Sequence, residues 1–362
     1  MDHETPKPRP LARLKNWVKT HRTRTYLIVG ATLIVAAGGA AYAVLTQKLP
    51  EVKVSSVRPK PKPKPPVFYS PLTGEKVADE AATKMPVTAI MIENSPDARP
   101  QSGIQESGIV FEAVAEGGIT RFLTLHQQDK PGLIGPVRSL RLYYVDWLAP
   151  FNASVAHVGG SKASLDEIRN GKYRDIDQFF NGAYYWRASD RWAPHNVYTN
   201  AEKLDTLNRT KGYTESSFQG FTRTDGKAAE KPNATQITVN ISGPLYNTSY
   251  TYDPTTNHYL RFLAGAPHLD REKGQITPSV VIALKVNEIH VFEDGYRESI
   301  ETTGSGQAVV FQNGTANEVT WRKPSHEAQL TFTDASGKDF PLSRGQTWIS
   351  AVPNGVGSVA WQ

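Results

Sequence analysis

The sequence contains no cysteine. A chain without cysteine forms no disulfide, has no thiolate nucleophile and no thiolate metal ligand, and carries no lipid on a cysteine. Its histidines also show no H-x-x-x-H spacing, so we expect no metal and no cofactor. Because large exported eukaryotic domains usually contain disulfides, the missing cysteines favour a bacterial source.

Net positive charge is confined to two short segments, although the formal net charge of the whole chain is +6. Residues 1–25 carry a net charge of +5 and residues 46–66 carry another +5, which leaves −4 for all other residues. A nucleic-acid-binding protein normally has a basic folded region. We therefore expect no nucleic-acid partner.

One long segment without any charge runs from Tyr26 to Leu45. As a helix rising about 1.5 Å per residue, it would cover roughly the 30 Å hydrocarbon core of a membrane. We predict a transmembrane helix at 26–45 and a cytoplasmic basic tail at 1–25, in a single-pass protein of the cell membrane whose C-terminal domains are extracytoplasmic. The alternative is a secretory signal cleaved after Ala43, although the run exceeds the usual signal core of about 7 to 15 residues.

Residues 46–66 form a segment rich in proline and lysine, and the two residue types alternate near the end of this segment. This composition favours an extended polyproline II chain, which the like charges stretch further. At about 3.1 Å per residue, the segment would reach roughly 65 Å. We predict a linker that presents the folded region within a cell wall.

The rest of the sequence is long enough for two domains. Residues 67–228 alternate strand and helix patterns and indicate a mixed α/β N-terminal domain, whereas residues 229–362 show strand patterns only and indicate a β-rich C-terminal domain. The predicted fold class is α+β, preceded by one transmembrane helix. The N-terminal strands are expected at 87–93, 108–115, 119–126 and 153–158, and the helices at 135–149, 161–171 and 199–211.

Arg138 and Arg141 lie three positions apart in "IGPVRSLRLYY", directly after a Gly-Pro step. If Pro136 starts a helix, both arginines share one face beside free backbone N–H groups. Two guanidiniums at a helix N-terminus favour a carboxylate or phosphate ligand. The alternative is that each arginine forms an internal salt bridge to a buried carboxylate.

Two glutamates in "VFEAVAEGG" are the acidic counterparts. Glu112 and Glu116 would point to the same face of a strand, roughly 13 to 14 Å apart. The two carboxyl groups of a glycosidase lie about 5 to 9.5 Å apart, so an acid/base pair would require Glu93 from the preceding strand.

Two further side chains are candidates for catalysis. Ser161 in "HVGGSKA" is either the nucleophile of a loose G-x-S-x-G elbow or a helix cap, and the pattern favours the cap. His195 in "YYWRASDRWAPHNVYTN" follows a proline, where it can carry a proton, contact a ligand or form a hydrogen bond at a helix entry. The aromatics of that stretch stack on sugar rings if they are exposed and form core if they are buried. The catalytic candidates are Glu93, Glu112, Ser161 and His195.

Five motifs in fixed order carry a resemblance: "IENSPDARPQSG", "EAVAEGGITRF", "IGPVRSLR", "HVGGS" and "PHNVYTN". Over roughly residues 68–360 the chain resembles the YerB-like family of bacterial surface lipoproteins, which has no known biochemical function. The resemblance implies an α/β N-terminal domain and a β-rich C-terminal domain. The N-terminus departs from it, because the family's lipidated cysteine is replaced by an apolar helix and a Lys-Pro spacer. The implied pocket consists of Glu93, Asn94, Arg99, Glu112, Glu116, Thr120, Arg121, Arg138, Ser139, Arg141, His157, Ser161, Arg187, His195 and Asn196.

The leading hypothesis from the sequence is a non-enzymatic envelope protein that binds an anionic cell-wall glycan or peptide, or a wall-synthesis protein. One alternative is a cell-wall hydrolase that uses Glu93 or Glu112, or Ser161 with His195. The other is a structural scaffold with an internal salt-bridge network. The expected ligand-binding residues are Arg121, Arg138, Arg141, Glu112, Glu116, His157, Arg187, His195 and Asn196.

Overall fold

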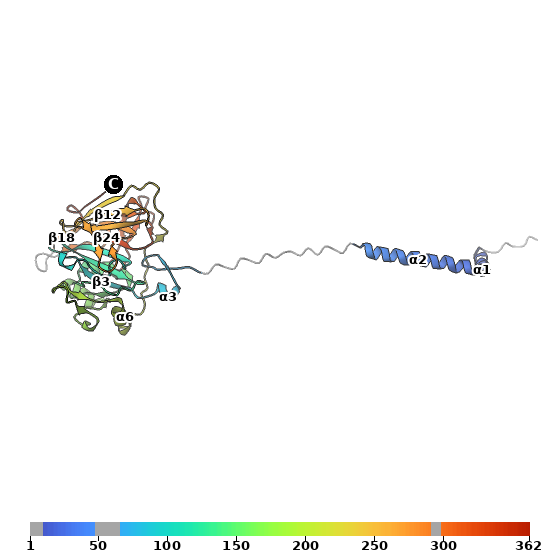
Figure 1. The fold of residues 1–362 in the computed structure, drawn as a ribbon, viewed down its shortest axis with the longest axis horizontal. Coiled ribbons are helices and arrows are strands. Elements are labelled where there is room, and N and C mark those ends of the chain that lie inside the picture. The colour runs from blue at the N-terminus through green and yellow to red at the C-terminus, as the bar shows by residue number, and fades with distance from the viewer. Residues whose placement is uncertain (1–9, 48–65, 291–297) are drawn as a thin grey trace, which may run out of the picture. The chain divides into compact units, whose positions relative to one another are not determined.

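The computed structural model describes residues 10–47, 66–290 and 298–362, and the chain divides into two compact units, Met1–Lys64 and Pro65–Gln362. The first unit contains the helices α1 (Pro10–Thr20) and α2 (Arg22–Thr46) (Figure 1). The predicted apolar helix is confirmed as α2, which is long and apolar enough to cross a membrane. Most of the predicted linker lies outside the described residues.

A ten-stranded sheet forms the centre of the second unit. Its strands come from both predicted domains, because β24 (Thr347–Pro353) of the C-terminal half pairs in parallel with β4 (Ile109–Glu116) of the N-terminal half. The two halves therefore share one sheet, and the domain boundary at residue 228 stays a prediction. In spatial order the strands are β22 (Thr331–Thr333), β21 (Thr315–Lys323), β20 (Gly304–Gln312), β17 (Val280–Val286), β24 (Thr347–Pro353), β4 (Ile109–Glu116), β5 (Ile119–His126), β3 (Thr88–Glu93), β6 (Ser154–Ala156) and β7 (Arg174–Asp175).

The central strands of this sheet are buried on both faces. Every residue of β3 and of β24 is buried, as expected for strands that are nearly continuous apolar runs. Successive side chains of a strand point to opposite faces, and β3 shows which layer covers each face. Ala89 and Met91 join one core cluster, and Ile90 and Ile92 join another.

Helices cover both faces of the N-terminal half of the sheet. The first core cluster contains side chains of α4 (Leu142–Leu148) and α5 (Lys162–Asn170), and Trp147 of α4 stacks on Phe111 of β4 at 5.3 Å. The second cluster contains Leu204 and Leu207 of α6 (Ala201–Thr210). In Figure 1, β3 lies between β24 and α6.

A five-stranded sheet covers the C-terminal half. Two of its strands, β12 (Thr248–Asp253) and β13 (His258–Leu263), alternate buried with less buried residues, which is typical of a sheet that packs on a core through one face. The buried side chains pack against Val281 and Ala283 of β17 and Phe311 of β20. In spatial order the strands are β14 (Ala266–Pro267), β13 (His258–Leu263), β12 (Thr248–Asp253), β11 (Gln236–Asn240) and β25 (Ser358–Trp361).

The remaining elements are short connections and hairpins. They are β1 (Phe68–Tyr69), β2 (Lys76–Val77), α3 (Glu80–Thr83), β8 (Trp186–Arg187), β9 (Val197–Tyr198), β10 (Arg223–Thr224), β15 (Leu269–Asp270), β16 (Gly274–Gln275), β18 (Glu288–His290), β19 (Glu298–Ile300), β23 (Leu342–Ser343) and the 3-10 turns η1 (Pro96–Ala98), η2 (Ala149–Phe151) and η3 (Gly182–Tyr184).

The helix predicted after the Gly-Pro step begins later than expected. The residues before Leu142 are extended, and Val137 forms a β-bridge with Ile92 of β3. Backbone groups that already bond to a neighbouring strand cannot also form a helical turn. The prediction that Arg138 and Arg141 share a face at a helix start is therefore wrong.

Candidate functional site

Glu93, the last residue of β3, joins two of the predicted site residues. Its Oε1 lies 3.3 Å from Arg138 Nε, and its Oε2 contacts His195 Nδ1 at 2.9 Å. The Glu93 side chain is only 3% exposed, whereas those of Arg138 and His195 are 24% and 22% exposed. One buried carboxylate thus holds two partly exposed side chains that carry hydrogen-bond donors. We call Glu93, Arg138 and His195 the open cluster.

Arg138 has unused hydrogen-bond donors. Its Nε lies near Glu93 without the alignment of a hydrogen bond, and within the described ranges nothing accepts from its two terminal nitrogens. Burial lowers the pKa of Arg138, while Glu93 acts in the opposite direction. An arginine keeps its charge in proteins. Arg138 is therefore a cation with free donors beside a carboxylate that holds it in place.

His195 uses one ring nitrogen for both of its contacts. Nδ1 lies 2.9 Å from Glu93 Oε2 and 3.1 Å from Ser95 Oγ. In a Ser-His-acid triad the two ring nitrogens have separate partners. Ser161, the predicted nucleophile, instead caps α5 by accepting from the Ser164 N–H. Neither serine forms a triad with His195, and the predicted capping role of Ser161 is confirmed.

Glu116 at the end of β4 joins two other predicted residues. Its Oε1 accepts from Arg121 Nη2 at 3.0 Å, and its Oε2 forms an ion pair with Arg141 Nη2. The Arg121 and Arg141 side chains are 1% and 4% exposed. Arg121 also donates to the Ser139 carbonyl at 2.9 Å, and burial lowers its pKa. Arg121 and Arg141 therefore both form ion pairs inside the protein. For Arg141, this matches the alternative of an internal salt bridge that the sequence left open.

Glu112 and Glu116 do not share partners, because β4 contains an irregularity. The pairing of β4 with β5 shifts between Val114 and Glu116, as at a β-bulge. Arg121, which binds Glu116, pairs across from Ala113, whose side chain points away from the face of Glu112. The common face predicted for the two glutamates is therefore wrong.

Glu112 belongs to a ring of buried side chains. Arg261 Nη2 donates to Glu112 Oε2 at 2.8 Å, and Arg261 Nε donates to His268 Nδ1 at 2.9 Å. The ring then closes through His268 Nε2 to Gln101 Oε1 (3.1 Å), Gln101 Nε2 to Asn94 Oδ1 (3.0 Å), Asn94 Nδ2 to Thr120 Oγ1 (2.7 Å) and Thr120 Oγ1 to Glu112 Oε1 (3.4 Å). We call these six residues the closed circuit, and none of them is more than 3% exposed.

The hydrogen bonds of the closed circuit all run from Arg261 toward Glu112. Each neutral member accepts one bond and donates the next, which requires an uncharged His268 that accepts at Nδ1 and donates at Nε2. Burial, Arg261 and Arg99 hold the pKa of His268 well below its usual range, consistent with this state. The single cation and the single anion of the circuit therefore satisfy each other.

The closed circuit connects both halves of the chain. Arg261 lies on β13 and Glu112 on β4, and the guanidinium of Arg261 stacks on the ring of Trp348 from β24 at 3.8 Å. The Trp348 indole N–H also donates to Glu112 Oε2 at 2.9 Å. Three strands from distant parts of the sequence thus meet at one buried ion pair.

The remaining predicted residues form local pairs. His157 is buried, and its ring nitrogens contact the Gly159 carbonyl at 2.8 Å and Asp175 Oδ1 at 3.1 Å. Arg187 donates to Asn196 Oδ1 at 2.7 Å. Among the described residues, no group of three His, Cys, Asp or Glu side chains is placed to hold a metal ion.

Three members of the closed circuit were not among the residues predicted from the sequence: Gln101, Arg261 and His268. Arg261 had a usable signal, because "HYLRFL" alternates and places it on the same face as the buried Tyr259 and Leu263. A charged side chain on the inner face of a strand requires a buried partner. His268 lies between two strands of two residues each, β14 and β15, so its surrounding sequence shows no alternation that would indicate a buried side chain.

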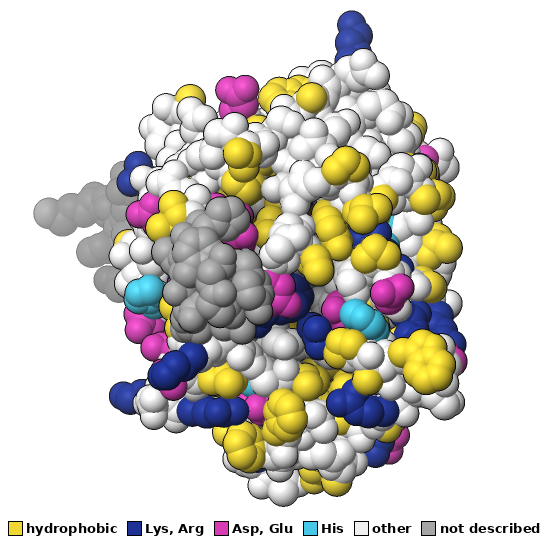
Figure 2. All heavy atoms as spheres, turned by 90° about the vertical axis from the view of Figure 1, so that its left-hand side faces the viewer, with side chains coloured by type: hydrophobic (Ala, Val, Ile, Leu, Met, Phe, Trp, Pro, Cys, Tyr) yellow, Lys and Arg dark blue, Asp and Glu magenta, His cyan; other side chains and the backbone are white. Residues whose placement is uncertain are grey.

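The aromatic stretch after residue 183 is divided between core and surface. Tyr185 is 6% exposed, whereas Trp192 is 89% exposed, and Phe179 and Phe180 nearby in sequence are 69% and 71% exposed. Figure 2 shows a face on which basic, acidic and histidine side chains gather around a hollow, with hydrophobic side chains around them. The molecule therefore offers both charged groups and exposed aromatics.

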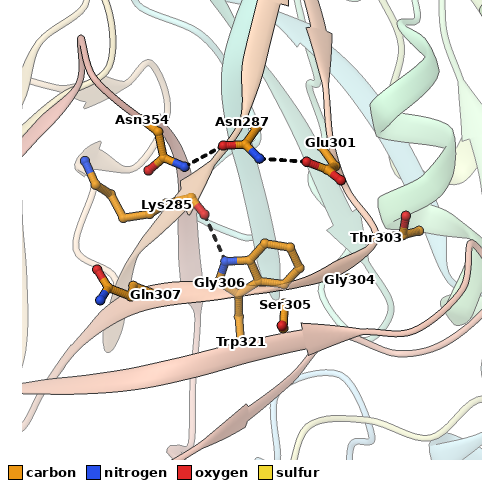
Figure 3. Close-up of a pocket in the computed structure, with 10 residues that line it drawn as sticks. All are labelled: Lys285, Asn287, Glu301, Thr303, Gly304, Ser305, Gly306, Gln307, Trp321 and Asn354. Carbon is orange, nitrogen blue, oxygen red and sulfur yellow. Dashed lines mark hydrogen bonds between the residues drawn. The ribbon is translucent and has the colours of Figure 1, made fainter.

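A separate cavity of about 330 Å³ lies in the C-terminal half (Figure 3). Asn354 Nδ2 donates to Asn287 Oδ1 at 2.8 Å, and Asn287 Nδ2 donates to Glu301 Oε2 at 2.7 Å. The Trp321 indole N–H is bonded to the Lys285 carbonyl at 2.9 Å. The cavity wall is polar, and the sequence did not single out any of its residues.

Two family models match the folded part of the chain. Residues 72–214 match "Protein of unknown function (DUF3048) N-terminal domain", and residues 237–349 match "Protein of unknown function (DUF3048) C-terminal domain". The chain belongs to the DUF3048 family. Its folded part is 32% identical over 289 residues to "Putative lipoprotein YerB" of Bacillus subtilis (strain 168), which is 79% of this chain and 86% of that protein.

A solved structure confirms the fold of this DUF3048 protein. The crystal structure of the YerB protein from Bacillus subtilis superposes with a TM-score of 0.72 at 28% identity, over 81% of this chain and 99% of that one. The resemblance inferred from the five motifs and the mixed helix and strand content are therefore confirmed. The relative is named as a lipoprotein, whereas this chain contains no cysteine that could carry a lipid.

Proposed function

We propose that this DUF3048 protein is a single-pass membrane-tethered envelope protein that binds an anionic wall component at the open cluster. The ligand would be a carboxylate of a wall peptide or a phosphate of a wall polymer. One observation carries the proposal. Arg138 is partly exposed and has two terminal nitrogens without an acceptor among the residues described.

The open cluster supplies two separate contact points for such an anion. Within the described structure, the Arg138 terminal nitrogens and His195 Nε2 have no hydrogen-bond partner. Glu93 contacts Arg138 Nε and His195 Nδ1, so it orients both side chains while their far ends stay free. Guanidinium groups bind carboxylates and phosphates through two parallel hydrogen bonds. A planar or tetrahedral oxyanion therefore fits this arrangement.

The N-terminal unit supports an envelope location. The relative from Bacillus subtilis is named as a lipoprotein, and a lipoprotein is held at a membrane by its N-terminus. In this chain α2 would replace the lipid as the anchor, with residues 1–25 in the cytoplasm and the folded unit outside the membrane. The proline-rich segment after α2 would give the folded unit reach into the wall.

Two of the three residue sets proposed for a hydrolase, Glu112 and Ser161 with His195, lack the geometry for it. Glu112 accepts hydrogen bonds from Arg261, Trp348 and Thr120 and is fully buried, so its carboxylate cannot exchange protons with a substrate. Ser161 caps a helix, and its described contacts do not include His195. Glu93, which contacts His195 at 2.9 Å, is the remaining candidate residue, and the hydrolase stays a prediction.

A structural scaffold is the second candidate, because the closed circuit and the Glu116 pairs favour it. Five of the nine predicted ligand-binding residues already have partners inside the protein: Arg121, Arg141, Glu112, Glu116 and His157. In a pure scaffold Arg138 would serve only to neutralise Glu93. The two candidates therefore differ in what Arg138 does.

Binding experiments on the full chain in detergent micelles test the proposal. A soluble muramyl peptide and a glycerol phosphate oligomer serve as the two probes. We expect the wild type to bind one of them and Arg138→Gln to bind it about tenfold or more weakly, because a charge-assisted hydrogen bond contributes about 1.5 to 3 kcal/mol. Arg322→Gln, which removes an exposed arginine from β21, is the matched control.

The outcomes separate the two candidates. Binding that is lost in Arg138→Gln and kept in Arg322→Gln supports the open cluster as the site. If neither probe binds, or if all three proteins bind a probe equally well, the open cluster is not a binding site and the scaffold is the better description.

A further inference from the structure

Helix α1 carries an apolar stripe that the described residues leave exposed. Leu11, Leu14, Trp17 and Val18 are 74%, 60%, 44% and 37% exposed, and α1 has no buried residue. At about 100° per residue, these four side chains fall within an arc of about 120°. We call them the α1 stripe. An isolated helix of 11 residues is marginal in water, so it gains stability when an apolar phase covers its stripe.

Basic side chains border the α1 stripe on both sides. At the same helical spacing, Lys15 and Lys19 lie on one side of the stripe and Arg13 lies on the other. Arg22 and Arg24 follow at the start of α2, and no Asp or Glu occurs between residues 5 and 50. Long basic side chains beside an apolar stripe allow the carbon stems to enter a bilayer while the charges reach its phosphates. The charge of this segment is complementary to an anionic lipid surface.

The chain breaks its helix directly between α1 and α2. His21 has φ −122° and ψ 41°, which lies outside the helical region. Figure 1 draws α1 as a separate short helix at the end of α2. A straight extension of α2 would carry the α1 stripe away from the membrane into water. A break at this point lets α1 turn and lie along the surface that α2 enters.

We propose that α1 lies in the membrane interface and binds anionic phospholipid on the side where α2 begins. The α1 stripe enters the boundary between head groups and acyl chains, and Arg13, Lys15 and Lys19 contact lipid phosphates. The inference rests on the proposed anchoring by α2 and adds a second, lipid-selective contact to it.

The missing cysteines make a direct test available. Full-length Leu14→Cys and Asn16→Cys proteins each take one environment-sensitive fluorophore, and Asn16 lies on the face opposite the α1 stripe. Both are reconstituted into phosphatidylcholine vesicles with and without phosphatidylglycerol. We expect the label at 14 to show blue-shifted emission and protection from acrylamide when phosphatidylglycerol is present. The label at 16 should stay accessible to water.

A charge variant tests the lipid preference. In the Leu14→Cys background, Arg13→Gln, Lys15→Gln and Lys19→Gln are combined. Each basic residue near an anionic surface contributes about fivefold to binding, so the triple variant should lose the response to phosphatidylglycerol. The matched control replaces Lys60, Lys62 and Lys64 with Gln in the same Leu14→Cys background. These lysines lie after α2 in the sequence, so this control should keep the fluorescence response to phosphatidylglycerol.

Three results would contradict the inference, and they are distinguishable. If the full chain does not float with either kind of vesicle in a density gradient, α2 does not anchor the protein. The inference about α1 then fails as well. If the chain floats but both labels are equally accessible in both vesicles, only the role of α1 is overturned. A label at 14 that is protected equally without phosphatidylglycerol overturns the anionic-lipid preference.

Discussion

The closed circuit and the open cluster contain the same kinds of side chains but differ in what those side chains leave unbonded. In the closed circuit, one arginine and one glutamate are linked by direct contact and through four neutral side chains, all buried. In the open cluster, one glutamate contacts an arginine and a histidine that are partly exposed and whose outer nitrogens have no partner among the described residues.

This difference separates structural charges from binding charges. A buried ion pair whose remaining donors and acceptors are satisfied contributes to a unique structure, and breaking it is costly. A cation that is oriented by a carboxylate but keeps free donors can still form bonds to a ligand. The type of residue does not distinguish the two cases. The number of unsatisfied polar atoms and their exposure do.

The largest effect should come from breaking the closed circuit at its cation. Arg261→Met leaves Glu112 as a buried carboxylate without its ion-pair partner, and we expect the free energy of unfolding to fall by about 3 to 5 kcal/mol. Chemical denaturation of the full chain in detergent measures this. Adding Glu112→Gln should recover part of the loss, because the orphaned charge is then removed. A loss below about 1 kcal/mol in Arg261→Met would show that the pair is not structural.

A neutral member of the same circuit should have a smaller effect. His268→Leu leaves Arg261 Nε without its acceptor and Gln101 Oε1 without its donor. Because no charge loses its main partner, we expect a loss of about 1 to 3 kcal/mol in the free energy of unfolding. The same denaturation experiment checks it. A loss as large as that of Arg261→Met would mean that the circuit acts as one unit and not as a ring of separable bonds.

The sequence predicted the secondary structure of the site better than its contacts. The four N-terminal strands occur as β3, β4, β5 and β6, within about two residues of the expected ends. The strand patterns succeed because alternation and apolar runs are local signals. The predicted helix start before Leu142 was wrong, because a β-bridge between Val137 and Ile92 of β3 holds the residues before Leu142 in an extended conformation.

The contacts of the site depend on long-range topology. Glu112 meets Arg261, 149 positions later in the chain, only because β24 and β13 bring the C-terminal half against β4. The spacing of residues in the sequence does not predict this contact between Glu112 and Arg261. The β-bulge before Glu116 also changes which face its carboxylate uses, and a bulge has no unique sequence pattern. The residue types of the site were therefore predictable, whereas their pairing was not.

The open cluster should tolerate the loss of its arginine better than the closed circuit does. Arg138 is partly exposed, and Glu93 keeps its contact with His195, so we expect Arg138→Gln to lower the free energy of unfolding by about 1 kcal/mol. Arg322→Gln is the control and should change it by less than about 0.5 kcal/mol. If Arg138→Gln is as destabilising as Arg261→Met, both sets of charges are structural and the contrast between them disappears.

Glu288 on β18 provides a third case, a carboxylate beside another carboxylate. Burial and the nearby Glu298 of β19 raise the pKa of Glu288 to about 7. In the folded state Glu288 thus binds its proton more tightly than at its ordinary value of 4.5. The stabilisation from that proton is complete below about pH 4.5 and is lost as the pH rises through about 7.

Glu288→Gln should therefore raise the free energy of unfolding at pH 8 by about 1 kcal/mol and change it little at pH 5. Denaturation of the full chain at the two pH values measures the difference. Glu298→Gln is the companion variant, and it should lower the pKa of Glu288 and shrink the pH effect. An equal change at both pH values would show that a cation neutralises Glu288 in the folded chain, which would place it with Glu116 among the internally paired carboxylates.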